Sequence, residues 1–373
     1  MGTEKPINNP TASRRAVMQR GAATVALASL GLAGITGTAA AKQKNAIPLS
    51  GPTTISSPGY YVLTRDIVGE GTITVEPGVT DVTIDGQGYT LSGDGSVSNG
   101  ISVGEELGSA TKEITIKNIH ITDFTRDGVE LLHVDGGTIQ DVVFSKNTFN
   151  GIFWAECGDV TVEGCTFSDN GMASFGYDCT TITFVRNYVT HSGGFTFGSS
   201  FALTVRNNDF EHSGRCVWLE ESTSDAQILN NRMYKCTSGV VLRFTDDILV
   251  RGNRIVANDS AGVVSEESQN VSVEKNQVLG NGSHGIYFEE FVETSHITKN
   301  NVFGNSGDGV HLGYGSDTNE IVKNRIFDNT GDGIELENAD DNVVRKNVIK
   351  RNGGVPLNLD SDSTGNVVED NKV

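Results

Sequence analysis

Short runs in which apolar residues lie two positions apart recur along most of the chain, and turn residues separate them. Between 271 and 290, for example, Val271 and Val273 lie two apart, and so do Ile286 and Phe288 after a turn. A spacing of two is the period of a β-strand and not the 3.6-residue period of a helix. The pattern therefore predicts an all-β chain of short strands and tight turns.

Asparagine recurs along the same segments at a nearly constant step of roughly 23 residues, which is in the range of known repeat proteins. The first series contains Asn208, Asn231, Asn253, Asn276, Asn300, Asn324, Asn347 and Asn371. A second series contains Asn258, Asn281, Asn305, Asn329 and Asn352, and it extends back to Asn147 and Asn170. A unit of this length cannot bury its apolar face alone and stacks on copies of itself. We predict a parallel β-helix with rungs about 4.8 Å apart, in which the asparagines hydrogen-bond from rung to rung.

The composition agrees with a single solenoid domain. The 373 residues include 45 Gly, which tight turns favour, and only 7 Pro, which hydrogen-bonded strands exclude. The spacing breaks only near the start of the repeats, and no linker marks a second domain. We expect one domain over 42–373, of about twelve rungs, with an N-terminal entry or cap at 42–80 and an irregular insertion at 92–112.

The repeat pattern resembles a known group of proteins. Pairs such as "KN-x-[IV]", followed about ten residues later by "G-[IV]-x-[LF]", resemble the repeats of the pectate-lyase-like superfamily. The entry segment at 59–93 is similar to the start of its NosD-like, carbohydrate-binding branch. This resemblance covers about 60–373 and implies a single-stranded right-handed parallel β-helix. It leaves the activity open, because members include lyases, epimerases, hydrolases and proteins with no known reaction.

The segment 1–41 has the features of an export signal. Arg14 and Arg15 are paired, no residue from Ala22 to Ala41 is charged, and the stretch ends in small residues. These features are typical of a twin-arginine signal peptide. We therefore predict a secreted or cell-surface protein with no membrane segment once the signal is removed. The alternative is that the stretch remains as a membrane anchor.

The chain is strongly acidic. With 28 Lys and Arg against 47 Asp and Glu, the net charge is −19, and no basic patch is apparent in the sequence. This charge argues against a nucleic-acid partner. Acidity spread along the repeats resembles the surface of proteins from extreme halophiles, where carboxylates keep the chain hydrated. A single surface Glu is therefore weak evidence for catalysis.

Alignment of the repeats on their Gly-Val or Gly-Ile strand places aromatic side chains on one outward face, because residues two apart on a strand point the same way. These residues are Phe153, Tyr177, Trp218 and Tyr287. Exposed aromatic rings are costly without a purpose, and sugar rings stack on them. The face therefore predicts binding of an extracellular polysaccharide over about 30 Å.

Ionisable side chains on the same face are candidates for acid–base catalysis. Arg243 falls between Glu220 and Glu266 on neighbouring rungs, and Glu289 and His311 follow. Carboxylates one or two rungs apart have the separations found in glycosidases, and His titrates near neutral pH. The resemblance to polyuronate lyases implies a different arrangement, in which Arg243 removes a proton beside a carboxylate that Ca²⁺ on the glutamates neutralises.

Two hypotheses about function remain open. In the first, the protein is a carbohydrate-active enzyme: a polysaccharide lyase, a C5-epimerase or a glycoside hydrolase. In the second, it is a non-catalytic structural or accessory protein of the cell surface, similar to NosD, and the glutamates recur simply as part of the repeat. The chain contains no Asn-Thr-Asp, Arg-Ile-Lys or Asp-Pro-His signature that would decide between them.

The register of the rungs predicts two further groups. Asp169, His191 and His212 share one turn column, and an Asp with two His is a metal-binding set. Cys157 and Cys179 share another column, which would place their Cα atoms about 5 Å apart, in the range of a disulfide. The last rung has no evident cap, so we expect a monomer or a homo-oligomer that covers this end.

Overall fold

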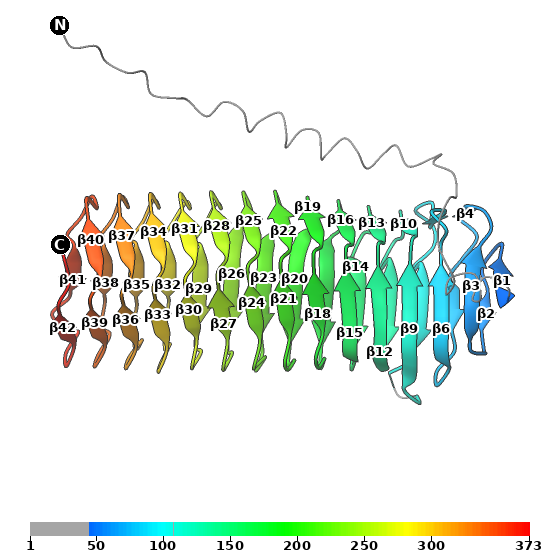
Figure 1. Ribbon diagram of the computed structural model, residues 1–373, viewed down its shortest axis with the longest axis horizontal. Coiled ribbons are helices and arrows are strands. Elements are labelled where there is room, and N and C mark those ends of the chain that lie inside the picture. Colours follow the sequence, from blue (N-terminus) through cyan, green and yellow to red (C-terminus); the bar gives the residue numbers. More distant parts are fainter. Residues whose placement is uncertain (1–44, 107) are drawn as a thin grey trace, which may run out of the picture. The chain divides into compact units, whose positions relative to one another are not determined.

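The computed structural model describes residues 45–106 and 108–373. The predicted export signal at 1–41 therefore lies outside the described residues. The chain from Ala46 to Val373 forms one compact unit, in which short strands wind into a long parallel β-helix (Figure 1). Among these residues, no helix has the length and apolar character that a membrane span needs.

Sheet A is the largest of three parallel sheets and contains 15 strands. They are β1 (Ile47–Leu49), β3 (Gly59–Leu63), β6 (Thr80–Asp85), β9 (Thr111–Lys117), β12 (Val134–Gln140), β15 (Gly158–Glu163), β18 (Thr183–Val185), β21 (Thr204–Arg206), β24 (Gln227–Leu229), β27 (Leu249–Arg251), β30 (Ser272–Glu274), β33 (His296–Thr298), β36 (Glu320–Val322), β39 (Val343–Arg345) and β42 (Val367–Glu369).

Sheet B contains 14 strands and sheet C contains 13. Sheet B consists of β2 (Thr54–Ile55), β5 (Ile73–Val75), β8 (Ile101–Gly104), β11 (Val129–Leu132), β14 (Asn150–Ala155), β17 (Met172–Tyr177), β20 (Gly193–Gly198), β23 (Arg215–Glu220), β26 (Ser238–Arg243), β29 (Val263–Glu266), β32 (Ile286–Phe288), β35 (Val310–Leu312), β38 (Ile334–Leu336) and β41 (Leu357–Leu359). Sheet C consists of β4 (Ile67–Val68), β7 (Thr90–Ser92), β10 (His120–Thr122), β13 (Val143–Ser145), β16 (Thr166–Ser168), β19 (Tyr188–Thr190), β22 (Asp209–Glu211), β25 (Arg232–Tyr234), β28 (Arg254–Val256), β31 (Gln277–Leu279), β34 (Asn301–Phe303), β37 (Arg325–Phe327) and β40 (Val348–Lys350).

These sheets confirm the predicted all-β fold class but correct the predicted number of turns of the β-helix. The strand numbers correspond to about 14 turns, whereas the sequence suggested about twelve. The entry strands β1 to β5 within 42–80 already extend all three sheets, so this segment adds rungs at the start of the chain. The rung that contains 92–112 is longer than the next one, since Thr80 pairs with Lys112 and Lys112 pairs with Asp135, and it includes β8, which pairs with β5 and β11. The bounds of the cap and of the insertion stay predictions.

The interior is filled by the inward side chains of each strand. In sheet B these include Ile152, Val217, Val240 and Val263, all fully buried. In sheet C, Phe144 and Phe167 stack with ring centroids 4.9 Å apart. Because each rung places the same residue type above its neighbour, the apolar alternation of the sequence becomes continuous buried rows.

The two predicted asparagine ladders are confirmed and lie in two of the turns. In the first, the backbone N–H of Asn276 donates to Oδ1 of Asn300 at 2.9 Å. In the second, the backbone N–H of Asn281 donates to Oδ1 of Asn305 at 3.0 Å. A third ladder, which the sequence analysis missed, runs through Ser295, Asn319, Asn342 and Asn366. Each amide thus satisfies turn groups that the strands leave without a partner.

A buried carboxylate stabilises the first rungs. Asp85 is 3% exposed. It accepts hydrogen bonds from the Tyr60 hydroxyl at 2.6 Å, from the backbone N–H of Gln87 at 3.0 Å and from Asn118 Nδ2 at 3.2 Å. Burial raises the pKa of Asp85, but these hydrogen bonds and the charge of Lys117 outweigh it and lower the pKa below its usual value. The ionised form is therefore the one that the fold stabilises.

We expect Asp85→Asn to lower the free energy of unfolding by about 1–3 kcal/mol at pH 7, because an amide cannot accept all of these hydrogen bonds. A lowered folded-state pKa contributes stability above the unfolded value of about 3.9, and this contribution is lost as the pH falls through the folded pKa. Urea unfolding at pH 7 and pH 3 should therefore show a smaller difference from wild type at pH 3. The exposed Asp81→Asn on the same strand is the control, and an equal effect of both changes would contradict the prediction.

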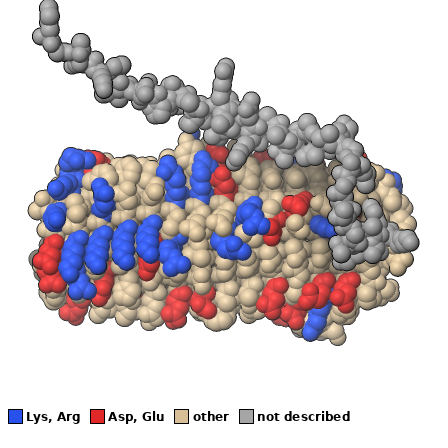
Figure 2. Space-filling model, viewed as in Figure 1, with Lys and Arg blue, Asp and Glu red and all other residues tan. Residues whose placement is uncertain are grey.

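Positive charge is gathered in a row along one side of the solenoid, although the sequence showed no basic patch. Figure 2 shows Lys and Arg side chains stacked on successive rungs. Four lysines that directly precede ladder asparagines occupy the same left-handed turn position on successive rungs: Lys275, Lys299, Lys323 and Lys346. Their regular spacing was visible in the sequence, but only the stacked turns bring them together. The absence of a nucleic-acid partner stays a prediction.

The last described rungs expose apolar side chains. Val367 and Val368 of β42 are 48% and 44% exposed. A monomer or an end-covering homo-oligomer stays a prediction.

Candidate functional site

One face of sheet B carries the predicted aromatic and ionisable side chains, and we call it the B face. The strand pairing confirms the alignment of the repeats. One register position on successive strands holds Phe153, Phe175, Thr196, Trp218, Val241, Val264, Tyr287, His311 and Glu335. The B face therefore brings together residues that lie far apart in the sequence.

An aromatic hollow of about 450 Å³ lies on the B face at β14 and β17. Phe153 and Phe175 stack in it with centroids 6.1 Å apart, and Phe149 and Met172 complete its apolar wall. Phe149 comes from the preceding turn and is 53% exposed. Such an open, ring-lined surface can contact the apolar face of a sugar.

A buried carboxylate lines the same hollow. Asp127 is 1% exposed, and its Oδ1 accepts a hydrogen bond from Asn150 Nδ2 at 2.7 Å. Its Oδ2 is buried and has no hydrogen-bond partner among residues 45–106 and 108–373, although the Arg126 guanidinium lies 3.9 Å away. Burial raises the pKa of Asp127, and the bonds from Asn150 only partly oppose this. The hollow therefore combines ring faces with polar groups able to orient a ligand.

Two of the four predicted sugar-stacking residues are partly covered by other side chains. The Tyr177 hydroxyl donates to Glu106 Oε1 at 3.3 Å, so the loop after β8 reaches the B face. The Arg215 guanidinium lies 4.2 Å from the centroid of the Trp218 ring. Of the four predicted sugar-stacking residues, Phe153 lines the aromatic hollow.

The middle of the B face holds the predicted Glu–Arg series. Arg243 of β26 forms an ion pair with Glu266, its register partner on β29. Burial raises the pKa of Glu220, and the charge of Glu221 adds to the rise. Burial also raises the pKa of Glu289, with a further contribution from Glu266. Two carboxyl groups on either side of the ion pair therefore hold protons more readily than an ordinary Glu.

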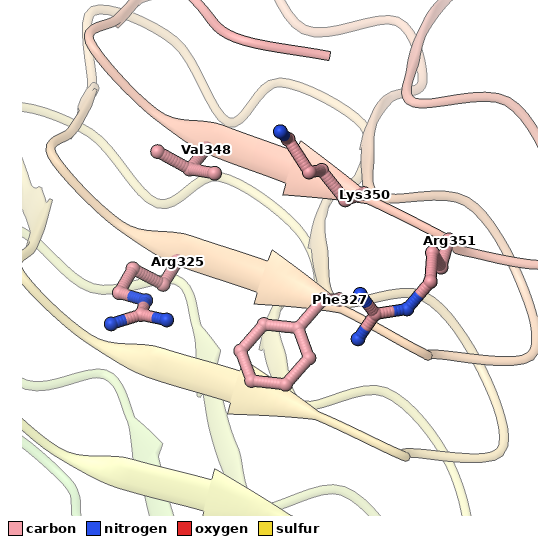
Figure 3. Close-up of a pocket in the computed structure, with 5 residues that line it drawn as sticks. All are labelled: Arg325, Phe327, Val348, Lys350 and Arg351. Carbon is pink, nitrogen blue, oxygen red and sulfur yellow. The ribbon is translucent and has the colours of Figure 1, made fainter. Parts of the chain in front are cut away.

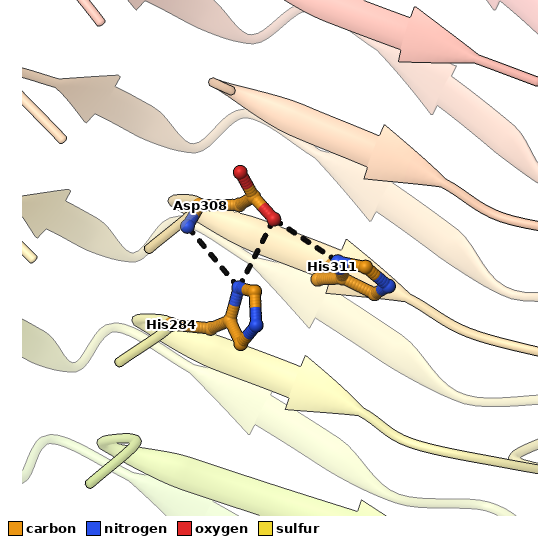
Figure 4. A group of neighbouring side chains, drawn as sticks. All are labelled: His284, Asp308 and His311. Carbon is orange, nitrogen blue, oxygen red and sulfur yellow. Dashed lines mark hydrogen bonds and ion pairs between the residues drawn. The ribbon is translucent and has the colours of Figure 1, made fainter. Parts of the chain in front are cut away.

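A dense polar cluster lies further along the B face. His284, Asp308 and His311 meet around one carboxylate oxygen (Figure 4). The Nδ1 atoms of both histidines lie 3.0 Å from Asp308 Oδ2. Glu335 Oε2 lies 3.1 Å from His311 Nδ1. The side chains of His311 and Asp308 are only 9% and 10% exposed, so His311 has little access to a substrate.

The charges of this cluster are strongly coupled. Burial raises the pKa of Asp308, but the contacts of its carboxylate with the imidazoles of His284 and His311 outweigh it and hold the pKa well below its usual range. Burial lowers the pKa of His311, but the Asp308 bond and the charge of Glu335 outweigh it, so the net shift is upward. Burial and the nearby Asp308 raise the pKa of Glu335.

Comparison with known proteins agrees with this geometry. The family model described as "Right handed beta helix region" matches residues 78–210, 187–325 and 295–373. The chain belongs to this family. The match supplies the right-handed sense of the β-helix, in agreement with the pectate-lyase-like resemblance, while membership of the NosD-like branch stays a prediction. The comparison with curated proteins gives no match.

Solved structures with this fold include proteins that act on polysaccharides. The A-module of the mannuronan C-5 epimerase AlgE6 of Azotobacter vinelandii is 18% identical, with a TM-score of 0.51 over 80% of this chain and 90% of that one. The periplasmic alginate epimerase AlgG is 14% identical, with a TM-score of 0.47 over 81% and 77%. The surface adhesin PfbA of Streptococcus pneumoniae is 15% identical, with a TM-score of 0.47 over 87% and 88%. Of these, the likeness to the AlgE6 module supports the fold and nothing more.

The predicted metal set at Asp169, His191 and His212 shares a turn column of the β-helix, as expected, but its ligand atoms do not converge. The two His rings stack in parallel with centroids 5.7 Å apart. Thr190 Oγ1 lies 2.9 Å from His191 Nδ1. Within 45–106 and 108–373, the groups of three convergent ligand atoms occur elsewhere, around Asp308.

The cysteines of the β-helix are free and buried. Cys157 and Cys179 lie on neighbouring rungs, as predicted, yet the predicted disulfide is not formed in this structure. The Sγ of Cys157 donates to the carbonyl of Ala155 at 3.3 Å, and the Sγ of Cys179 donates to that of Tyr177 at 3.3 Å. The nearby Cys157 side chain is the main cause of the raised pKa of Cys179.

A smaller hollow of about 110 Å³ lies on sheet C (Figure 3). Arg325, Phe327, Val348, Lys350 and Arg351 line it. Its Arg351 already forms a bidentate pair with Asp328, at 2.8 and 2.7 Å. The hollow is basic but shallow, and none of the predicted site residues lies in it.

The sequence analysis missed the column that directly precedes the strand glycines of sheet B. This column contains Asp127 of the aromatic hollow and, further along, His284, Asp308 and Asp332. The alignment followed only the residues after each glycine. The same alignment, extended one position earlier, would have placed these polar side chains beside the B face.

Proposed function

We propose that this β-helix binds an extracellular polysaccharide along the B face and that the Glu–Arg series transforms the bound chain by acid–base chemistry. The aromatic hollow carries the proposal, because Phe149, Phe153 and Phe175 surround a space of sugar size next to the orienting groups of Asp127. The export signal predicted from the sequence supports a site of action outside the cytoplasm.

The fold supports the same substrate class. The AlgE6 module, which shares the β-helix at a TM-score of 0.51, is a mannuronan C-5 epimerase. A polymer laid across successive strands would pass from the hollow at β14 and β17 to Glu220 at the end of β23, two rungs beyond β17. At about 4.8 Å per rung, this path is about 15 Å, a few sugar units.

The chemistry that suits the series is proton transfer beside a carboxylate. Arg243 can pair with the carboxylate of a uronate and stabilise the charge that develops when the neighbouring carbon loses its proton. Glu220 and Glu289, whose pKa values are raised by burial and by neighbouring carboxylates, are the candidates to accept or donate that proton. Return of a proton to the opposite side of the ring gives epimerisation, and loss of the neighbouring glycosidic oxygen gives lyase cleavage.

A binding protein without catalysis is the second candidate. The observation in its favour is that Arg243 already has a partner in Glu266, so its charge is neutralised before any substrate arrives. The aromatic hollow would then act alone, as a carbohydrate-binding surface of an accessory protein.

Arg243→Ala separates the two functions. We expect wild type to bind at least one member of a panel of neutral and acidic polysaccharides, with and without Ca²⁺, and to release an altered product. In the variant, turnover of an acidic chain should fall by about 10- to 1,000-fold, because a charge-stabilising group is lost, while binding at the hollow persists. Arg254→Ala on sheet C is the charge-matched control. Binding without turnover by wild type would favour the accessory protein, and no binding to any glycan would exclude both candidates.

A further inference from the structure

The cluster of His284, Asp308 and His311 resembles a binding site more than a packing feature of the repeat. One nitrogen from each imidazole and one oxygen of Asp308 lie within 4.8 Å of one another. The residues come from two adjacent rungs, on β35 and in the turns before β32 and β35. Two imidazoles and a carboxylate form the donor set that divalent transition metals prefer.

The spacing of these donors is that of metal ligands. The nitrogens of His284 and His311 each lie 3.0 Å from Asp308 Oδ2, and Glu335 Oε2 lies 3.1 Å from the His311 nitrogen. Ligands about 2.1 Å from one ion lie about 3.0 Å apart at right angles and about 3.4 Å apart in a tetrahedron. A single ion can therefore contact these donors with small side-chain adjustments.

The hydrogen bonds inside the cluster leave one contact unsatisfied. The backbone N–H of Asp308 donates to Nδ1 of His284 at 3.1 Å, so this nitrogen presents a lone pair. The same nitrogen faces Asp308 Oδ2, another acceptor, at 3.0 Å. Two acceptors at this distance repel each other. A cation that binds both removes the repulsion, at the expense of the weaker amide contact.

The charge balance also calls for a cation. Carboxylate oxygens of Asp308, Glu335 and Glu337 lie 3.0, 3.1 and 3.4 Å from nitrogens of His311, and Asp308, Asp332 and Glu335 also form a convergent oxygen group of their own. Among residues 45–106 and 108–373, the ion pairs of Asp308, Glu335 and Glu337 involve imidazoles and neither Lys nor Arg. A single imidazolium is a weak counter-charge for the three partly buried carboxylates of Asp308, Asp332 and Glu335.

Glu337 is placed to orient the His311 ring, as carboxylates often do for metal-binding histidines. If His311 binds through Nδ1, its Nε2 points to Glu337 Oε2, which lies 3.4 Å away. Histidines that bind metals commonly donate their second N–H to a carboxylate, which fixes the ring and raises its basicity. Asn358 Nδ2 similarly donates to Asp332 Oδ2 at 2.9 Å and to Glu335 Oε1 at 3.2 Å.

We infer that His284, Asp308 and His311, with Glu335 as a fourth ligand, bind one divalent first-row transition-metal ion of the Zn²⁺ or Mn²⁺ type on the B face. Mixed nitrogen and oxygen donors favour such an ion over Ca²⁺, which takes oxygen ligands. Binding of the ion does not depend on the proposed function. Its use in holding the carboxylate of a bound uronate does rest on that function, because Tyr287 and Glu289 lie on the neighbouring rung of the same face.

Metal content tests this inference without any glycan. The full chain, free of affinity tags, is equilibrated separately with Zn²⁺, Mn²⁺ and Ca²⁺, and bound metal is measured by mass spectrometry and affinity by calorimetry. We expect one Zn²⁺ or Mn²⁺ per chain. His284→Ala should weaken binding by more than the roughly 10- to 100-fold that loss of an outer partner costs. Binding should also weaken as the pH falls, because protons compete with the metal for the imidazole nitrogens.

The control is His191→Ala, which removes an exposed His of the other predicted metal set and should leave binding unchanged. Glu335→Gln, which keeps the size of the side chain, provides a second variant if His284→Ala unfolds. It should weaken binding while the thermal unfolding of the metal-free protein stays near that of wild type. Absence of bound Zn²⁺ and Mn²⁺, binding of Ca²⁺ alone, or loss of binding only in His191→Ala would overturn the inference. None of these results depends on whether the protein binds a polysaccharide.

Discussion

Asn300→Ala is expected to destabilise the β-helix by roughly 3 kcal/mol or more, since each buried polar group left without a partner costs about 1–3 kcal/mol. Asn300 Oδ1 accepts the backbone N–H of Asn276 at 2.9 Å and its Nδ2–H at 3.1 Å. Asn300 Nδ2 donates to the carbonyl of Val273 at 2.7 Å. Alanine removes the partner of the Asn276 backbone N–H, the partner of the Val273 carbonyl and one of the two acceptors of Asn276 Nδ2, in a turn where both asparagines are buried. Urea unfolding followed by circular dichroism measures the loss.

The neighbouring residue is a matched control for this prediction. Asn301 follows directly in the sequence, but it is half-buried on β34 and its Oδ1 has no hydrogen-bond partner. Asn301→Ala removes the same atoms and should change the free energy of unfolding by less than about 0.5 kcal/mol. Equal losses for the two variants would mean that asparagine acts through turn propensity and not through the ladder.

Phe153→Ala should weaken polysaccharide binding by about 30-fold, which corresponds to about 2 kcal/mol for a central aromatic contact. The ring of Phe153 lies against the rings of Phe175 and Tyr177 on the next strand, β17, with centroid distances of 6.1 and 5.9 Å. Its removal opens the aromatic wall of the hollow and takes away a stacking surface. Calorimetry or affinity electrophoresis with the best ligand of the glycan panel measures the effect.

Phe327→Ala is the control for the hollow. Phe327 is also half-buried and stacks on a second phenylalanine, Phe303, with centroids 5.0 Å apart, but it belongs to sheet C. Its replacement removes the same side chain from another sheet and should leave glycan affinity unchanged. If both variants bound as wild type does, the B face would not be the binding surface. If both lost affinity equally, the loss would reflect a general change in the solenoid.

The fold was predictable because the chain repeats one unit of short strands and turns many times. A nearly constant repeat step, strands with a period of two, and an asparagine at each turn are features of the sequence alone. They determine a stack of rungs, since every repeat needs a neighbour to cover its apolar side. The rung count was too low because the entry strands β1 to β5 join the sheets without carrying the asparagine pattern.

The candidate site was only partly predictable, for a physical reason. Register placed Phe153 above Phe175 and Arg243 beside Glu266, because residues at the same phase of a solenoid stack. The register of the strands does not determine the side-chain rotamers. Arg215 covers the ring of Trp218, and His191 and His212 stack on each other without a shared ligand position.

By itself, therefore, the sequence determined the parallel β-helix, its turn ladders and the face on which aromatic and acidic side chains gather. Only the tertiary structure decided where that face is hollow and where its charges converge. The β-helix, its ladders and the shared face depend on the period and phase of the repeats, which the linear sequence records completely. The hollow and the convergence of charges depend on side-chain rotation and on turn residues, such as His284 and Asp308, whose side chains contact each other across rungs at 3.0 Å.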